Sequence, residues 1–232
     1  MKNLLYTDFA SEYGKAIQKN LYNAHFERPS LQAMFPDLRN ISVLDLGCAS
    51  GEHSQYLLEH GANVTAIDIS HEMIDLMRRR FEDSLMCYVQ DLSIGLPEED
   101  DKTFDLVICP LTIHYIENLK PLFTDIGRVL KKNGLFIFST HHPILDFQAS
   151  VSGDYFENEF VTQKWDVIGT PVEVSFYRRS LTSLFTLIKN AGLCVVDMNE
   201  GAPLEKMRQL DPKRYKYLST KPQFLFLKCM KF

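Results

Sequence analysis

The sequence lacks the features that mark several large classes of protein. Among its 232 residues no apolar run is long enough to span a membrane, and the N-terminus carries no apolar signal-peptide core. The formal net charge of −5 shows no excess of basic residues, which a nucleic-acid-binding face would need. Internal repeats and low-complexity segments are also missing. We therefore expect a globular protein whose partner is neither a membrane nor a nucleic acid.

Cysteine is sparse, and its placement argues against a structural metal. The cysteines form no C-x-x-C pair and no close cluster with histidine, so the sequence predicts no metal site. An odd number of scattered cysteines in apolar stretches is typical of buried, reduced thiols, and we expect a cytoplasmic protein. The five are Cys48, Cys87, Cys109, Cys194 and Cys229.

What the chain does contain is an alternation of short apolar runs and amphipathic helical stretches. The order predicts an α/β protein with a doubly wound, mainly parallel seven-stranded sheet and helices on both faces. We expect the last strand to run antiparallel, because no clear helical crossover precedes it. The predicted strands are 41–46, 63–67, 86–89, 104–109, 135–138, 193–198 and 224–230, and the predicted helices are 52–60, 71–81, 121–132 and 181–191.

Two segments depart from this alternation, and we expect both to belong to a single domain that covers residues 1–232. Residues 1–40 predict short helices, with Tyr6 and Tyr13 on one apolar stripe. Residues 141–177 have many aromatic side chains and no helical period, and they follow the carboxyl end of a strand. Ligands bind at that end of such sheets. The first segment therefore predicts a helical cover and the second a lid that forms an acceptor site.

The first strand leads into a turn with two glycines, Gly47 and Gly51, followed by a helix. Glycines at such a turn let backbone N–H groups approach a ligand at the positive end of the helix. A dinucleotide fingerprint would need G-x-G-x-x-G, but Ala49 and Glu52 occupy its other glycine positions. The acidic Asp45 would also repel a pyrophosphate. The turn therefore favours a ligand that carries a positive charge.

Aspartates recur at the predicted ends of the first three strands, at Asp45, Asp68 and Asp91. The carboxyl ends of parallel strands meet at one edge of the sheet, so we expect these side chains in one crevice. Asp68 lies 17 residues after Gly51, about the distance at which an acidic residue reaches a ribose diol. Asp91 is suited to accept from an exocyclic amine. The alternative is that each aspartate only caps the helix that follows it.

At these residues the sequence resembles class I S-adenosylmethionine-dependent methyltransferases. The resemblance extends over essentially the whole chain and includes the N-terminal tyrosine helix. It implies S-adenosyl-L-methionine as the cofactor and leaves the methyl acceptor open. The matching motifs are Val43–Cys48, Val64–Ser70, Tyr88–Leu92, Phe104–Ile108 with His114-Tyr115, and Arg128–Gly134.

The resemblance also implies which residues hold the cofactor. Asp45 and the turn lie near its methionine part, Asp68 near the ribose, and apolar side chains beside the adenine. Ala49 stands where the family has glycine, and an alanine there needs a negative φ or is strained. For Ile69 and Met73 an ordinary core position is an equally open alternative. The implied set is Tyr6, Tyr13, Asp45, Gly47, Cys48, Ala49, Asp68, Ile69, Met73, Asp91, Leu92, Cys109 and Pro110.

For the acceptor we expect a small molecule that is methylated on oxygen, nitrogen or another nucleophilic atom. Aromatic side chains with a few polar groups suit such a site, although they also suit the core of the lid itself. For Arg178 and Arg179 we expect that at least one lies on a solvated face. The candidates are Tyr155, Trp165, Tyr177 and Arg178 for the acceptor, and His114, His141 and His142 for a general base, with His142 favoured.

Two other functions remain open from the sequence. One is a cofactor-binding protein without catalysis that engages a partner through its lid. The other is a methyltransferase that acts on a macromolecule. Catalysis without any base, by orientation alone, is the alternative to a histidine mechanism.

Overall fold

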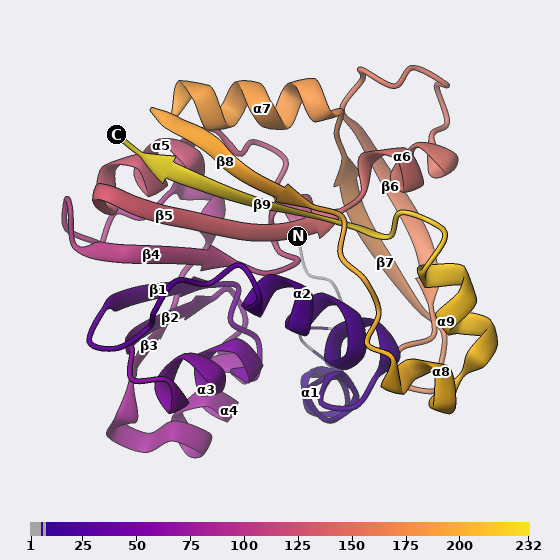
Figure 1. Cartoon of the computed structure of the whole chain (residues 1–232), viewed down its shortest axis with the longest axis horizontal. Helices are drawn as coiled ribbons and strands as arrows, with labels where there is room; N and C mark the ends of the chain where they lie inside the picture. The colour runs from indigo at the N-terminus through magenta and orange to yellow at the C-terminus, as the bar shows by residue number, and fades with distance from the viewer. Residues whose placement is uncertain (1–5, 7) are drawn as a thin grey trace.

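A computed structural model describes Tyr6 and residues 8–232, and its centre is a seven-stranded sheet (Figure 1). The strand order is β3-β2-β1-β4-β5-β9-β8, with β9 antiparallel to both neighbours and all other pairings parallel. The predicted fold, including its antiparallel last strand, is confirmed. The strands are β1 (Ser42–Leu46), β2 (Asn63–Asp68), β3 (Met86–Val89), β4 (Phe104–Cys109), β5 (Leu130–His141), β8 (Leu193–Asn199) and β9 (Phe224–Lys231).

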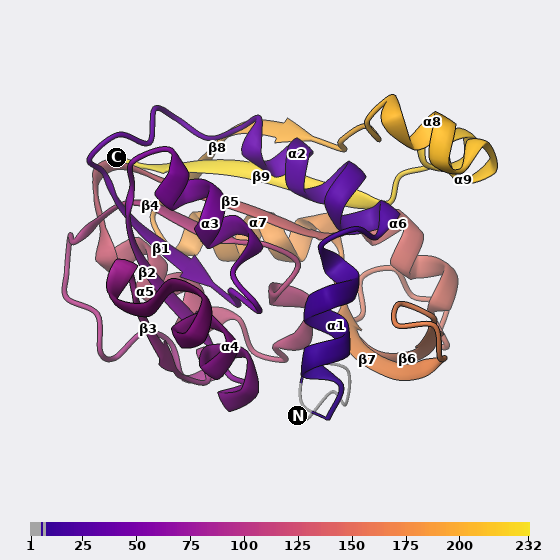
Figure 2. The same ribbon diagram turned by 90° about the horizontal axis from the view of Figure 1, so that it is seen from below.

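Helices cover both faces of this sheet, as Figure 2 shows for α2 and α3 on one side and α7 on the other. Alternate residues of β5 supply both cores: Phe136 and Phe138 pack with α5 and α7, while Ile137 packs with α2 and α3. The α-helices are α1 (Ala10–Ile17), α2 (Arg28–Gln32), α3 (Glu52–Glu59), α4 (His71–Phe81), α5 (Lys120–Val129), α6 (Pro143–Asp146), α7 (Leu181–Asn190), α8 (Lys206–Leu210) and α9 (Pro212–Leu218).

Helix starts follow their predicted caps, but one helix end does not. Ser70 and Ser180 each accept a backbone N–H of the first turn, as expected for N-caps. The prediction that α5 extends to Lys132 is wrong, because the chain enters β5 at Leu130. The Lys131 ammonium lies 2.7 Å from Asp105 of β4. This cross-strand ion pair holds the lysine in the sheet.

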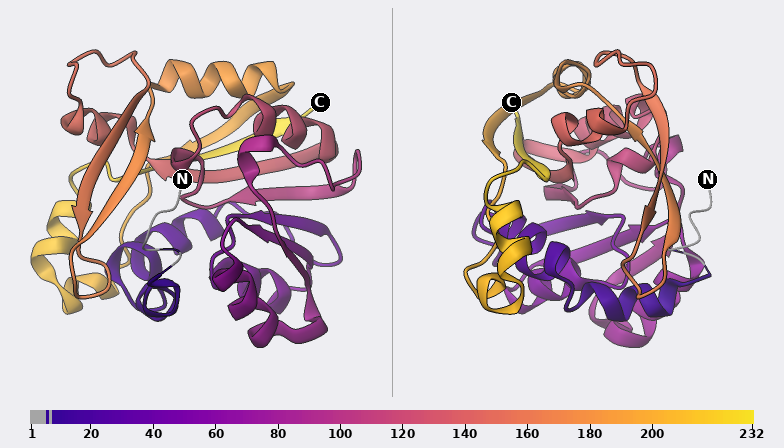
Figure 3. Two further views of the ribbon diagram at one scale, coloured as in Figure 1. Left: turned by 180° about the vertical axis from the view of Figure 1, so that it is seen from behind. Right: turned by 90° about the vertical axis from the view of Figure 1, so that its right-hand side faces the viewer.

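The segment after β5 folds into a separate hairpin of β6 (Glu159–Trp165) and β7 (Val172–Arg178), which pair antiparallel. It stands beside the N-terminal helix α1 in Figure 3, and Tyr6 and Tyr13 pack against its residues Val172 and Val174. Short helical turns complete the chain: the π-helix η2 (Asn23–Glu27) and the 3₁₀ turns η3 (Glu82–Ser84), η4 (Leu92–Ile94), η5 (Ile113–Tyr115) and η6 (Phe147–Ala149).

The cysteines agree only in part with the expectation of buried thiols. All five cysteines are free thiols, and three of them are buried. The expectation of buried thiols is wrong for Cys194, which is exposed on the edge strand β8, and only partly right for Cys87. Within the part of the chain that the structure describes, no helix has the length and apolar character needed to cross a membrane.

Candidate cofactor and active site

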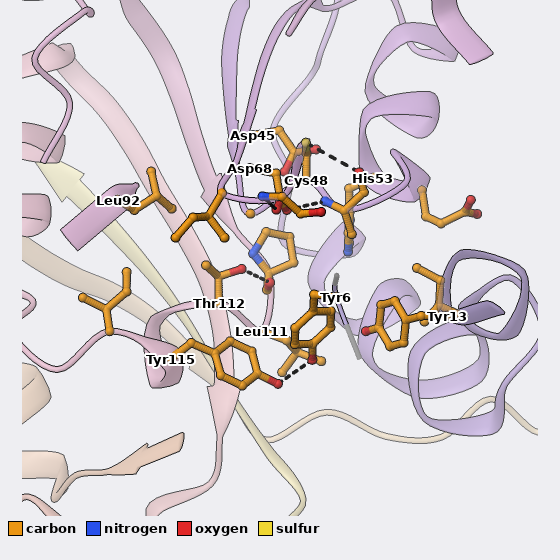
Figure 4. A pocket seen from close by; sticks show the side chains of 18 of the residues that line it. Tyr6, Tyr13, Asp45, Cys48, His53, Asp68, Leu92, Leu111, Thr112 and Tyr115 are labelled. Atoms are coloured by element: carbon orange, nitrogen blue, oxygen red, sulfur yellow. Dashed lines mark hydrogen bonds between the residues drawn. The ribbon is translucent and has the colours of Figure 1, made fainter. Parts of the chain in front are cut away.

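A cavity of about 650 Å³ lies at the carboxyl ends of the parallel strands, beneath the N-terminal helices (Figure 4). It collects residues from the turn after β1, the end of β2, and the loops after β3 and β4. This is the edge at which open α/β sheets bind ligands. The residues used below that line it are Tyr6, Tyr13, Glu27, Arg28, Asp45, Gly47, Cys48, Ala49, Glu52, His53, Asp68, Ile69, Asp91, Leu92, Pro110, Leu111, Thr112, Tyr115, Glu117 and Tyr177.

The turn after β1 lines the cavity and is fastened to β2, because the Gly47 and Cys48 amides donate to the Ile67 carbonyl oxygen. Gly47 and Gly51 have φ of 74° and 88°, in the region that favours glycine. Ala49 also has a positive φ, of 48°, which for alanine costs on the order of 1 kcal/mol. Its N–H donates to Asp68 Oδ2 at 2.9 Å, and this bond offsets the strain. The alanine therefore preserves the turn that a glycine would form.

Asp68 is held by the backbone on both of its oxygens. Oδ2 accepts from the Ala49 amide, and Oδ1 accepts from the Ser70 amide at 2.9 Å. Burial raises the pKa of this carboxyl, and the backbone hydrogen bonds partly oppose that rise. Each oxygen has a second lone pair, so the rigid carboxylate can still accept from a ligand at the cavity wall. The N-cap of α4 is Ser70, so Asp68 does not cap that helix, and its contacts with the two amides are compatible with a ligand role.

Asp45 is completely buried at the end of β1. Its Oδ2 accepts from the Ser54 hydroxyl at 2.6 Å, whereas Oδ1 has no hydrogen-bond partner among the residues that the structure describes. Burial raises the pKa of this carboxyl to about 6. A buried carboxylate oxygen without a partner is costly, and a cationic ligand group would satisfy it.

The part of the cavity that follows β2 and β3 combines a carboxylate with apolar side chains. Asp91 accepts from the Ser93 amide at 2.8 Å and is exposed, and Leu92 beside it is buried. Ile69 leaves half of its surface exposed although it is a large apolar side chain. Such exposed apolar surface inside a cavity suits a flat ring.

Three tyrosines close the remaining side. The Tyr6 and Tyr115 hydroxyls lie 2.5 Å apart, and the Tyr13 ring packs edge-on to Tyr6 at 4.9 Å. Burial raises the pKa of all three phenols, so they remain neutral hydrogen-bond donors at physiological pH. Tyr115 comes from η5, and the cover therefore joins the N-terminal segment to the loop after β4.

The sequence and the fold of this chain are similar to those of known proteins. A family model described as a methyltransferase domain matches residues 44–138. The crystal structure of an S-adenosylmethionine-dependent methyltransferase from Mesorhizobium loti has a TM-score of 0.70 and 25% identity, over 88% of this chain and 97% of that one. A Listeria monocytogenes protein, proposed to be of the same class, has a TM-score of 0.74 and 25% identity, over 89% and 96%. The chain has the fold of the class I S-adenosylmethionine-dependent methyltransferase superfamily, and its residues 44–138 match the methyltransferase domain.

Curated methyltransferase sequences match a shorter part. The ubiquinone biosynthesis O-methyltransferase of Rickettsia typhi is 29% identical over 131 residues, which are 56% of this chain and 52% of that protein. The chain spans about half the length of the curated relatives it matches.

The cavity of this methyltransferase domain fits S-adenosyl-L-methionine. The cofactor carries an ammonium, a sulfonium, a ribose diol and a flat adenine. The unpartnered Asp45 oxygen suits a cation, the two fixed oxygens of Asp68 suit hydroxyl donors, and Ile69 and Leu92 suit the ring. The wall also carries several carboxylates and a single arginine, Arg28, which agrees with a cationic ligand.

Two of the expected cofactor residues do not reach the cavity. Met73 and Cys109 are fully buried, and neither lies on the cavity wall. Met73 sits in the first turn of α4, whose buried side faces the core, and Cys109 packs in the main apolar cluster. For Met73 the core alternative is the correct one. The other expected cofactor residues all line the cavity.

The expected acceptor residues divide in the same way. Only Tyr177 lines the cavity, where its hydroxyl lies 3.3 Å from Glu117. Trp165 packs in the small core that the hairpin shares with the N-terminal tyrosines. Tyr155 and Arg178 belong to the insertion itself, because the buried guanidinium pairs with Glu159 and donates to the Tyr155 carbonyl oxygen.

The expectation that Arg178 or Arg179 lies on a solvated face is wrong. Arg178 and Arg179 are both buried, so neither lies on a solvated face. The Arg179 guanidinium donates to backbone carbonyl oxygens of Ile116 and Glu117, which fixes the end of β7 to the loop after η5. These arginines therefore hold the insertion in place.

None of the three expected histidines lines the cavity. His114 and His141 stack on each other with ring centroids 3.8 Å apart, and burial lowers the pKa of His114 well below its usual range. His141 is the last residue of β5 and does not follow it as expected. His142 accepts from the Ile144 amide and lies 3.0 Å from Glu200, so both of its ring nitrogens are engaged.

The cavity also contains polar residues that the sequence did not single out, above all Glu27 and His53. His53 could have been predicted from the sequence, because it follows the second glycine by two residues, in the first turn of α3. Glu27 had no sequence signal. It reaches the site because the chain between α1 and α2 forms a π-helix, an uncommon turn that is frequent at functional sites.

Proposed function

We propose that this protein transfers a methyl group from S-adenosyl-L-methionine to an oxygen or nitrogen of a small molecule. The observation that carries the proposal is the buried Asp45 oxygen without a partner, in a cavity whose wall also supplies fixed carboxylate oxygens for a ribose. The family match supports the same cofactor. When bound, the cofactor supplies an electrophilic methyl group on a positively charged sulfur.

The residues of the chain bind, orient and exclude water. Asp45 holds the ammonium, Asp68 the ribose hydroxyls, and Ile69 and Leu92 the adenine. The turn needs no rearrangement, because its positive φ values are already set and its amides are held by Ile67 and Asp68. The tyrosines of the cover keep water from the reacting atoms, which strengthens the electrostatic interactions inside.

A small acceptor is supported by the aromatic lining of the site. Tyr6, Tyr13, Tyr115 and Tyr177 line the cavity together, and aromatic side chains with a few polar groups suit a small molecule. A relative named for ubiquinone biosynthesis is consistent with such an acceptor. We place the acceptor between these tyrosines and the loop at Pro110.

The experiment is a screen of small metabolites with cofactor labelled in its methyl group, alongside calorimetry with S-adenosylhomocysteine. Binding with transfer to a metabolite supports the proposal. Binding without transfer to any metabolite favours the cofactor-binding protein or a macromolecular acceptor, which a labelled cell extract then separates. Absence of cofactor binding would contradict the proposal altogether.

Replacing Asp68 by asparagine should weaken S-adenosylhomocysteine binding by about ten- to hundredfold, or about 1–3 kcal/mol. The amide presents an NH₂ where both carboxylate oxygens now accept N–H groups, so one acceptor is lost. Calorimetry on folded protein measures the change. An unchanged affinity would remove Asp68 from the binding site.

Measuring two ligands on both the natural protein and the Asp68→Asn protein distinguishes the loss of a ribose contact from a change in the turn. A 2′-deoxy analogue lacks one hydroxyl, and it should bind the natural protein more weakly than S-adenosylhomocysteine does. If Asp68 accepts from that hydroxyl, the analogue loses less in the Asp68→Asn protein. Equal losses in both proteins would mean that Asp68 acts only through the turn.

We also propose that the N-terminal segment and the β6–β7 hairpin form a cover over the bound cofactor. They share one apolar cluster, in which Tyr6 and Tyr13 meet Val172 and Val174. Hydrogen exchange should slow over residues 8–20 and over β7 when S-adenosylhomocysteine is added. The remote helix α9 serves as the control. Equal exchange with and without ligand would identify these residues as ordinary core.

A further inference from the structure

A second pair of ionisable side chains faces the cavity and has no part in the cofactor contacts described above. Glu27 and His53 are both buried, and the Glu27 Oε2 atom lies 3.3 Å from the His53 Nε2 atom. The other oxygen of Glu27 accepts from the Ser139 hydroxyl at 2.6 Å. Both oxygens of Glu27 are therefore in contact with polar groups of the protein.

This geometry decides which nitrogen of His53 carries the proton. A carboxylate only accepts hydrogen bonds, so Nε2 must be the N–H that donates to Glu27. The Nδ1 atom then carries the free lone pair, and within the described part of the chain it has no hydrogen-bond partner although it is buried. A buried nitrogen without a partner is uncommon and calls for one. A carboxylate that orients an imidazole in this way is the arrangement of a general base.

Charged side chains from several elements surround His53. Glu27 from η2 contacts its Nε2 atom, and His53 lies near enough to Asp45 of β1 to oppose the rise that burial causes in the pKa of that carboxyl. Glu52, the residue before His53, pairs with Arg28 at 4.0 Å and also with Arg80.

The pair is also tied to the floor of the cavity. The Leu111 amide donates to the Ser139 hydroxyl at 3.0 Å, and that hydroxyl donates to Glu27. Leu111 and its neighbour Pro110 line the cavity in the loop after β4. A continuous chain of hydrogen bonds therefore runs from the loop to the imidazole and fixes the position of the pair relative to that loop.

We propose that His53, oriented by Glu27, is the general base that deprotonates the methyl acceptor. This inference rests on the proposed methyl transfer and narrows the acceptor to a hydroxyl or amine that loses a proton as it reacts. The acceptor X–H gives its proton to His53 Nδ1 while X bonds to the methyl carbon. The bond from that carbon to sulfur breaks, and its electron pair stays on sulfur. The imidazolium then releases the proton to water.

The first test needs no acceptor and no cofactor. Nitrogen NMR of the imidazole in the ligand-free protein should show His53 as the Nε2–H tautomer. In Glu27→Gln the amide can donate to Nε2, so the Nδ1–H tautomer should increase. A wild-type His53 that already carries its proton on Nδ1 would overturn the proposal, because the nitrogen free to act as a base would then face Glu27.

The second test uses an acceptor found in the metabolite screen. His53→Gln should lower kcat by about 10²–10⁴-fold and remove the fall in rate at acidic pH, because the base is inactive when protonated. Glu27→Gln should act in the same direction by a smaller factor. S-adenosylhomocysteine affinity should be unchanged in both variants, which also shows that they fold.

The matched control is His60→Gln, because His60 lies at the end of the same helix, is exposed and is outside the cavity. Its kcat and pH profile should equal those of the natural protein. A loss of S-adenosylhomocysteine affinity that parallels the loss of rate in His53→Gln would assign the pair to cofactor binding and refute the base. An unchanged kcat in His53→Gln would do the same. A natural protein that binds no cofactor would instead refute the proposed function itself.

Discussion

Replacing Gly47 by alanine should destabilise the protein by about 3 kcal/mol and reduce S-adenosylhomocysteine affinity by at least about tenfold. Gly47 has a φ of 74°, which costs an alanine about 1–2 kcal/mol. A Cβ at this position would also overlap the Thr112 side chain, coming within 2.6 Å of its methyl carbon. Relieving that overlap moves the loop after β4, which forms the cavity floor. Urea unfolding and calorimetry measure the two effects.

Gly153 provides the matched control for this substitution. It has the same φ of 74°, but a Cβ there would meet no atom within 4 Å. Gly153→Ala should therefore cost only the backbone part, about 1–2 kcal/mol, and leave cofactor affinity unchanged. If the two variants lose equal stability, the contact with Thr112 is unimportant. If Gly47→Ala keeps full affinity, the turn is not part of the binding site.

Replacing Asp45 by asparagine should have opposite effects on stability and on binding. The natural protein pays to bury a carboxylate with one unpartnered oxygen, and removing that charge should stabilise the ligand-free fold by about 1–3 kcal/mol at neutral pH. The ammonium of the cofactor would lose its charged partner, so S-adenosylhomocysteine affinity should fall about a hundredfold or more. Such an exchange of stability for function is common at binding sites.

The pH dependence of the same carboxyl follows from its raised pKa of about 6. Between about pH 4 and 6 the folded state binds more protons here than the unfolded state, so this group lowers stability as pH rises through that window. The stability difference between Asp45→Asn and the natural protein should grow over the same range and then level off. Cofactor affinity of the natural protein should fall about tenfold per unit below pH 6, because the protonated carboxyl has lost its charge.

Asp75→Asn is the control for the change in net charge, because Asp75 is exposed on α4 and outside the cavity. It should change neither stability nor affinity measurably. A destabilised Asp45→Asn would show that the orphaned oxygen has a partner in solution. If S-adenosylhomocysteine affinity is the same at pH 5 and pH 7.5, Asp45 does not bind the ammonium of the cofactor.

The order of strands and helices could be predicted from the sequence because it depends on local patterns. Apolar runs, amphipathic periods and caps such as Ser70 each act within a few residues. The end of α5 was missed because the chain joins β4 from Leu130 onward, with Lys131 paired to Asp105, and this tertiary pairing replaces the local helix signal. That pair joins residues 26 positions apart, and no local pattern records it.

Most of the residues expected to hold the cofactor line one cavity, because they stand at strand ends. Gly47, Asp45 and Asp68 follow directly from the position at which each strand stops. Met73 was assigned to the wrong face of α4. Neighbouring positions of a helix point in different directions, so an error of one or two residues exchanges the ligand-facing side for the side that faces the core.

The acceptor and catalytic half depended on tertiary structure. The three histidines near the ends of β4 and β5 are close in sequence to the site, yet they pack away from the cavity. Glu27 and His53 are 26 residues apart and come from η2 and α3, which meet only because both pack on the same face of the sheet. Strand ends and glycine turns are local, and the sequence alone determined the fold and the cofactor edge. Side chains that meet across a cavity depend on packing over long separations, and only the folded chain decided which of them face each other.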